Sequence, residues 1–205
     1  MGWYSLAQCF GILAFCLHMA SGYQKNPGKI LRLTGGSNLF WVGHYLAISS
    51  PLAAAMSLLA ALRLYLCAWL PRKYVPCIVV ASLILFMTVT IKTYTAPHSL
   101  LPVIGSTIFT LTLLFQDKAL YIRFGNLACA ILWMAHGMYT LSLIEIFSNG
   151  CVSFSILYGI IKYEYEIPAK SQLARHYTVQ PGKLVNLEPL RPFYEKISPL
   201  FSSSA

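Results

Sequence analysis

Apolar residues come in seven long runs along this chain, separated by short polar or basic junctions. Each run is close to the roughly 17–25 residues that an α-helix needs to cross about 30 Å of hydrocarbon. The runs lack the alternation of apolar and polar residues of a membrane β-barrel, and unpaired backbone groups cannot face lipid. The pattern therefore predicts seven transmembrane helices, over residues 3–23, 29–48, 51–70, 74–92, 99–115, 119–140 and 143–162.

Two segments of the chain recur at nearly one spacing. Residues 5–11 read almost in register with residues 99–105, an offset of 94 positions (99 − 5). The tetrapeptide Trp-Val-Gly-His at 41–44 recurs as Trp-Met-Ala-His at 133–136, an offset of 92 (133 − 41). A Trp and a His that recur together indicate duplication, and a unit of about 65 residues fits both offsets.

The amino-acid composition indicates a protein surrounded by lipid. The chain is 57% hydrophobic and 10% charged, with a mean hydropathy of +0.63. A soluble domain carries about 25% charged residues to keep its surface wetted, so this composition excludes a globule in water. No Lys or Arg precedes the first apolar run, unlike a secretory signal, so we expect a retained span.

Basic residues predict the orientation. They follow the first, third, fifth and seventh predicted helices, whereas the junctions at 49–50 and 141–142 carry none. By the positive-inside rule the N-terminus is then on the outer side of the membrane and the C-terminus is cytoplasmic. The net charge of +9 is explained by this topology, and no basic patch of a soluble domain predicts nucleic-acid binding.

These orientations predict an all-α membrane protein with a 3+1+3 plan. Residues 1–70 and 98–163 form two three-helix repeats of equal orientation, joined by a linker helix within 71–97. Such parallel repeats are related by an axis along the membrane normal. Residues 164–205 are predicted to form a flexible cytoplasmic tail.

The recurring motifs suggest a family. The opening Leu-Ala-Gln-x-x-Gly at 6–11, its counterpart at 100–105, and the Trp-x-x-His at 133–136 closely resemble the YgjV family of bacterial inner-membrane proteins, over about residues 5–165. This resemblance implies a multi-pass protein of the bacterial inner membrane.

More distantly, the 3+1+3 plan resembles the SWEET sugar transporters. Those proteins place a Trp on the second helix of each unit and an Asn on the third, lining a central pocket. The resemblance implies pocket positions for Trp41, Trp133 and Asn149. The proline that SWEET-type units place in their first helix corresponds to Pro102, whereas Gln8 stands at the equivalent position of the first unit.

The Trp and His pairs are the most distinctive polar and aromatic positions within spans. Trp41 and Trp133 each lie about 10 Å below the surface at 1.5 Å per residue, where they either line a pocket or belong to an interfacial aromatic belt. His44 and His136 follow three residues later on the same helix face. An ionisable group in a span usually faces a wet cavity; the alternative is an imidazole bonded to a neighbouring helix's carbonyl.

Other residues have weaker signals. Pro102 is a candidate gating bend or a first-turn proline whose missing N–H costs nothing. Arg63 is expected to snorkel toward the cytoplasmic end of its helix. The six cysteines stand singly, without CxxC or metal spacing. We therefore predict no metal site, no cofactor and no enzymatic activity.

Two functions agree with these observations. The first is a small-solute transporter with a central pocket between the two repeats, formed by Trp41, His44, Trp133, His136 and Asn149. The alternative is a non-transporting membrane scaffold, sensor or accessory subunit. The expected partners are the lipid bilayer and a small solute, and the sequence specifies no oligomeric state.

Overall fold

The computed structural model describes residues 2–93, 97 and 100–167, and the regular structure of this part of the chain is all helical. One unit spans Met1–Tyr165, and residues 168–205 of the predicted tail lie outside the described residues. The α-helices are α1 Gly2–Gly22, α2 Pro27–Ala47, α3 Pro51–Trp69, α4 Val75–Thr93, α5 Leu100–Thr112, α6 Ala119–Thr140 and α7 Leu143–Ile160. Short helical turns are η1 Arg72–Tyr74, η3 Leu113–Phe115 and the π-helical η4 Ile161–Glu166.

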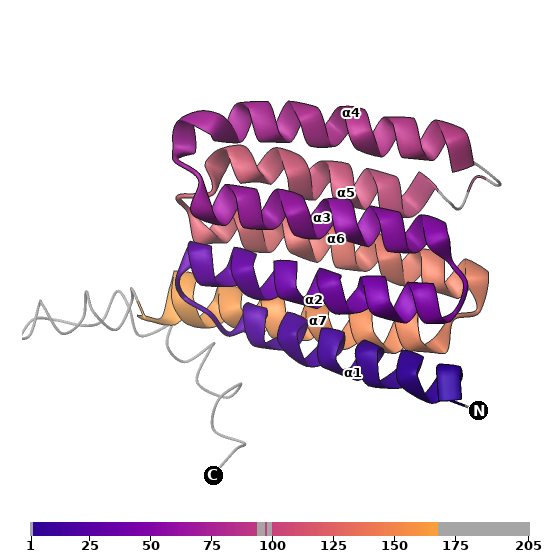
Figure 1. The fold of residues 1–205 in the computed structure, drawn as a ribbon. Helices are drawn as coiled ribbons and strands as arrows, with labels where there is room; N and C mark the ends of the chain where they lie inside the picture. The colour runs from indigo at the N-terminus through magenta and orange to yellow at the C-terminus, as the bar shows by residue number, and fades with distance from the viewer. Residues whose placement is uncertain (1, 94–96, 98–99, 168–205) are drawn as a thin grey trace, which may run out of the picture. The chain divides into compact units, whose positions relative to one another are not determined.

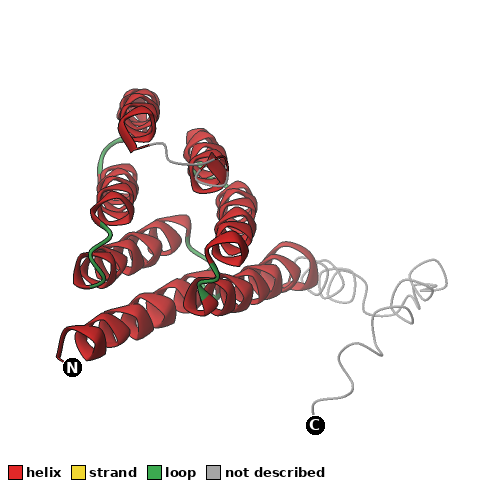
Figure 2. Ribbon diagram, turned by 90° about the vertical axis from the view of Figure 1, so that its right-hand side faces the viewer, coloured by secondary structure: helices red, strands yellow, loops and turns green. Residues whose placement is uncertain are grey.

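The helices of this unit lie side by side, and each packs against its neighbours in sequence (Figure 1). Helix α1 packs against α2 and also against α7, while α4 packs between α3 and α5. Seen from near the helix ends, α1–α3 and α5–α7 lie on opposite sides, with α4 at one edge (Figure 2). The packing thus forms a closed ring of neighbours. The predicted duplication of α1–α3 as α5–α7 stays a prediction.

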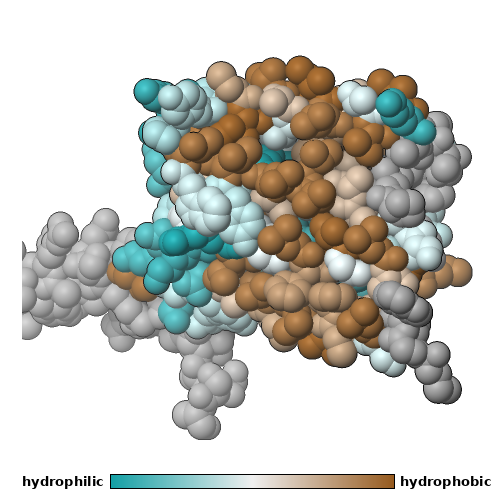
Figure 3. Space-filling view, in the orientation of Figure 1, coloured by the Kyte–Doolittle hydropathy of each residue, from teal (hydrophilic) through white to brown (hydrophobic). Residues whose placement is uncertain are grey.

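The outer surface is strongly apolar. Large hydrophobic side chains are exposed on several helices, among them Ile91, Leu143 and Phe154. Figure 3 shows hydrophobic residues over most of the face that it draws, with hydrophilic residues gathered toward its left edge and at its upper right. Exposed apolar patches of this extent mark contact with a membrane or partner. In this unit the apolar surface fits lipid, because the hydrophilic residues gather near the helix ends.

Three of the described helical stretches are long and apolar enough to cross a membrane: Ser5–Gly22, Arg72–Lys92 and Leu143–Tyr165. Ala53–Trp69 and Leu100–Phe115 are apolar but shorter. Helices α2 and α6 are less apolar because their inward faces carry buried polar residues, such as Thr34 and Asn126. Three of the seven spans predicted from the sequence thus meet these criteria of length and apolarity. The full number of seven spans stays a prediction.

Two helix junctions share an unusual backbone geometry. Ser49 and Leu141 are the non-glycine residues of the described chain with positive φ, at 57° and 55°. In each case the next N–H bonds back five residues, from Ser50 to the carbonyl of Tyr45 and from Ser142 to that of Gly137. These bonds satisfy carbonyl groups that a helix C-terminus leaves unpaired.

Helices α1 and α7 meet through glycines. A Cβ on Gly159 would fall against the carbonyl of Gly22, and a Cβ on Gly22 would fall against the backbone of Ser155. In lipid, small residues let helices approach closely, so that packing replaces the hydrophobic drive. This contact closes the ring between the first and last helices.

Candidate functional site

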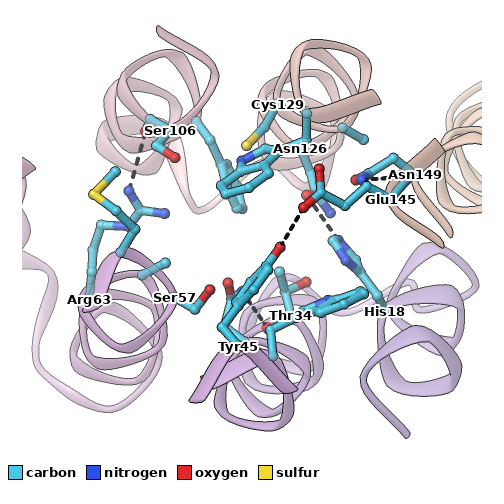
Figure 4. Close-up of a pocket in the computed structure, with 17 residues that line it drawn as sticks. His18, Thr34, Tyr45, Ser57, Arg63, Ser106, Asn126, Cys129, Glu145 and Asn149 are labelled. Atoms are coloured by element: carbon cyan, nitrogen blue, oxygen red, sulfur yellow. Dashed lines mark hydrogen bonds between the residues drawn. The ribbon is translucent and has the colours of Figure 1, made fainter. Parts of the chain in front are cut away.

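A cavity of about 70 Å³ lies between α1–α3 and α5–α7. A water molecule needs about 10–15 Å³ of such space, so the cavity has room for several waters or one small solute. No described residue of α4 is among those that line it. The lining residues are His18, Thr34, Asn38, Trp41, Tyr45, Met56, Ser57, Ala60, Arg63, Ser106, Phe109, Asn126, Cys129, Ala130, Trp133, Glu145 and Asn149 (Figure 4).

Three of the predicted pocket residues line this cavity: Trp41, Trp133 and Asn149. Trp41 stacks on Tyr45, with ring centroids 5.6 Å apart and an interplanar angle of 28°. The Asn149 amide donates to the carbonyl of Glu145 at 2.9 Å. The structure therefore brings these residues together from α2, α6 and α7; their role in solute binding stays a prediction.

His44 is not among the lining residues. Its Nδ1 donates to the carbonyl of Ala7 on α1 at 2.9 Å, and its ring lies 3.2 Å from where a Cβ on Gly11 would be. The side chain is 5% exposed and meets Trp41 edge-on. Three residues along a helix turn a side chain by about 60°, which is enough to direct His44 at α1 while Trp41 faces the cavity.

His136 lies behind the cavity wall. Its Nδ1 is 3.2 Å from Oε2 of Glu145, while the Tyr45 hydroxyl donates to Oε1 of the same carboxylate at 3.4 Å. Glu145 itself lines the cavity, as does Trp133, whose ring centroid lies 5.9 Å from that of His136. The Tyr45–Glu145 bond joins α2 to α7 across the space between the two groups of helices (Figure 4).

Pro102 does not line the cavity. It is the third residue of α5 and is buried. At this position the first-turn N–H has no intrahelical partner, so proline removes no hydrogen bond. A gating role for Pro102 stays a prediction.

Arg63 is the residue of the cavity whose role sequence reasoning missed. Instead of snorkelling toward a helix end, its side chain is 2% exposed. Its Nη1 donates to the carbonyl of Ser106 at 3.3 Å and to the Thr110 hydroxyl, both on α5. A buried arginine is recognisable in a sequence only as a charge inside a span, because the bonding helix is not adjacent in the chain.

His18 and Asn126 form a second polar group that faces the cavity. His18 Nε2 lies 3.2 Å from Oδ1 of Asn126, which joins α1 to α6. The sequence favours a structural use for His18, because Thr112 stands at its counterpart in the second unit. Asn126 carries no signal in the sequence beyond its polarity within a span.

A different buried arginine closes the end of the bundle near η4. Arg123 of α6 is 1% exposed and pairs with Glu164, while its Nη2 donates to the carbonyl of Gln24. The guanidinium lies 5.1 Å from the ring centroid of Tyr163, whose hydroxyl donates to the carbonyl of Tyr23 at 2.8 Å. These bonds join α6 and η4 to the segment that connects α1 with α2.

No group of three or more His, Cys, Asp or Glu side chains in the described part of the chain could hold a metal ion. The cavity instead presents hydroxyl, amide, carboxylate and guanidinium groups beside aromatic faces. That donor set suits binding of a polar solute by hydrogen bonds and charge.

Comparison with known families decides the identity at family level. The family model Imp-YgjV, described as bacterial inner membrane protein, matches residues 5–166. The chain belongs to this YgjV family. The match begins within α1 and extends through α7, so all the residues that line the cavity lie within the YgjV-family region. No curated protein and no solved structure matches the chain.

Proposed function

We propose that this YgjV-family protein is a carrier, not an enzyme, that moves a small polar solute across the bacterial inner membrane. The observation that supports this most is the polar cavity lined jointly by α1–α3 and α5–α7. Ionisable side chains inside a membrane protein are costly unless they face one another or a wet cavity. His18, Arg63 and Glu145 satisfy that requirement by lining one cavity.

The proposal includes the 3+1+3 plan. The two positive-φ residues Ser49 and Leu141 are 92 positions apart (141 − 49), the offset of the Trp-x-x-His motif. The backbone bonds from Ser50 and Ser142 share this offset. Matching turns at matching positions support duplicated helical hairpins, which as parallel repeats would rock about the cavity to alternate access.

All seven helices span the membrane in this proposal, with the N-terminus periplasmic and the C-terminus cytoplasmic. The basic junctions support this orientation. A reporter fused after residue 165 should then read cytoplasmic, and one inserted at 97 should read periplasmic. The opposite reading at either position would show that a span is miscounted.

Access of water to the cavity can be tested at a natural cysteine. Cys129 lines the cavity, whereas Cys151 on α7 has similar partial burial and does not. Two variants would each keep one of these residues and replace the other five cysteines with serine. In native vesicles, a small membrane-impermeant thiol reagent should label the Cys129 variant much faster than the Cys151 variant. Equal rates would indicate a cavity closed to water.

The transport role needs a flux measurement. A thermal-shift screen over sugars, amino acids, nucleosides and small carboxylic acids would select a solute for uptake into proteoliposomes. Trp133→Ala should abolish that uptake while the protein stays folded, because Trp133 lines the cavity. Trp69→Ala is the matched control, since Trp69 ends α3 and is 69% exposed. If no solute shifts the unfolding temperature or is taken up, the alternative of a scaffold, sensor or accessory subunit gains support.

A further inference from the structure

The guanidinium of Arg63 has little to compensate its charge. Its Nη1 donates hydrogen bonds to the carbonyl of Ser106 and to the hydroxyl of Thr110, and neither acceptor is charged. Its Nε is buried without a hydrogen-bond partner. The aromatic rings of Phe86 and Phe109 lie 5.2 and 5.4 Å from Cζ and stabilise the cation only in part.

No carboxylate of the described residues forms an ion pair with Arg63. The carboxylate that lines the same cavity, Glu145, is bonded instead to Tyr45 and His136. Figure 4 shows Arg63 and Glu145 at opposite sides of the group of lining residues. A buried arginine is effectively always protonated, and an uncompensated buried charge is strongly unfavourable. The cavity therefore has one positive charge without a charged partner among the described residues.

Further polar groups line the cavity with Arg63. Ser57 and Ala60 precede it on α3 at intervals of three residues, so all three face the cavity. Ser57 is 5% exposed and has no recorded hydrogen bond within the described chain. Across the cavity, Asn126 bonds to His18 through Oδ1, which leaves its amide N–H groups as donors.

We propose that this cavity binds the carboxylate group of a small monoanionic solute at Arg63. The guanidinium has a planar fork that matches a carboxylate, and such charged hydrogen bonds are stronger than neutral ones. One positive charge balances one negative charge, and the Glu145 carboxylate in the same cavity disfavours a dianion such as phosphate. This inference names the solute class of the proposed carrier and rests on that function, but binding is measurable without transport.

The first test compares acetate with acetamide, which has nearly the same shape and no charge. Acetate should raise the unfolding temperature of the purified full-length protein by an amount that grows with the logarithm of its concentration, whereas acetamide should not. Arg63→Gln should lose this rise or need at least tenfold more acetate for the same rise, because one charge-assisted bond is worth about 1.5–3 kcal/mol.

Arg72→Gln is the matched control, since Arg72 pairs with Asp117 at the surface. General salt effects act on all the variants alike, so the difference between them isolates the site. An equal rise of the unfolding temperature in Arg63→Gln, an equal response to acetamide, or a response to chloride alone would overturn the proposal.

A second test does not depend on the folding of an Arg63 variant. In the protein that keeps only Cys129, acetate should slow reaction of the thiol with the impermeant reagent several-fold, and acetamide should not. The Cys151 variant should react at the same rate with either compound. Unchanged rates at Cys129 would contradict the site.

The results separate this inference from the carrier function. Acetate binding at Arg63 without uptake of any carboxylate would refute the carrier and keep the site. Uptake of a neutral solute that acetate does not inhibit, in a protein without an acetate response, would keep the carrier and refute the site.

Discussion

Two arginines of the described residues are buried, and their surroundings differ. Arg123 is paired with Glu164, bonded to the carbonyl of Gln24 and placed over Tyr163. Arg63 is equally buried, lies beside two phenylalanines and has only neutral acceptors. The Nε of each is buried without a hydrogen-bond partner, but only Arg123 has a carboxylate partner among the described residues. This pairing distinguishes Arg123, which joins helices, from Arg63, at which we propose that a ligand binds.

The helices around the two arginines differ in the same way. Near Arg123, α1 and α7 approach through Gly22 and Gly159, and a Cβ on Gly159 would lie 3.2 Å from Nε of Arg123. Near Arg63, α3 and α5 border the cavity. Close packing surrounds the paired charge, and open space adjoins the unpaired one.

The largest effect is expected for Arg123→Met. The change removes the charge partner of Glu164 and the bond to Gln24 in one step. Breaking a buried pair costs about 3–5 kcal/mol, and we expect the lower end because the Glu164 side chain is 27% exposed. The free energy of unfolding in detergent micelles measures this loss. A loss below about 1 kcal/mol would remove the structural role assigned to the pair.

Gly159→Ala should come next, with a loss of about 1–3 kcal/mol from overpacking. The added methyl group would meet the carbonyl of Gly22, which is backbone and cannot turn away. Gly150→Ala on the same helix is the control, because its methyl group would meet only the Met134 sulfur at 3.7 Å. The same denaturation assay should show no loss for this control. Similar losses for both variants would mean that the close approach of α1 and α7 at Gly159 is not the cause of the lost stability.

Arg63→Met should change the free energy of unfolding by less than about 1 kcal/mol, or increase it. Apolar replacement of a buried charged group of similar volume is often neutral or stabilising. The bonds to Ser106 and Thr110 are lost, but so is the uncompensated charge. A destabilisation as large as that of Arg123→Met would contradict the comparison and make Arg63 a structural residue.

Arg72→Gln should have the smallest effect, below about 0.5 kcal/mol, since exposed ion pairs contribute little. Arg72 and Asp117 are 63% and 47% exposed and lie 3.2 Å apart. Raising the salt concentration should remove even this difference, because salt screens exposed charges. A larger loss of unfolding free energy that persists in high salt would contradict the small contribution expected of an exposed ion pair.

The helices were largely predictable from the sequence. The predicted spans 51–70 and 119–140 agree closely with α3 and α6, and the predicted span 99–115 corresponds to α5 together with η3. Apolar runs bounded by prolines and polar junctions carry this information locally. Pro27 and Pro51, for instance, stand in the first turns of α2 and α3.

The cavity was predictable only in part. Trp41 and Trp133 can be identified from the sequence, because tryptophan is rare and the motif that contains it recurs. The contact of His44 with Ala7 and the bonds of Arg63 to α5 depend on which helix lies opposite, across 37 and 43 or more positions of chain. Periodicity places a residue on a helix face, but the neighbour of that face is decided by packing of the whole bundle.

Helix α4 packs between α3 and α5, and none of its described residues lines the cavity. In evolutionary terms, the exposed side of α4 needs only apolar residues over a sufficient length, and not particular side chains. Residues such as Ile84 and Ile91, which are 61% and 75% exposed, should be freely exchanged for other apolar residues among family members. Phe86, which lies over Arg63 and is 1% exposed, should vary much less.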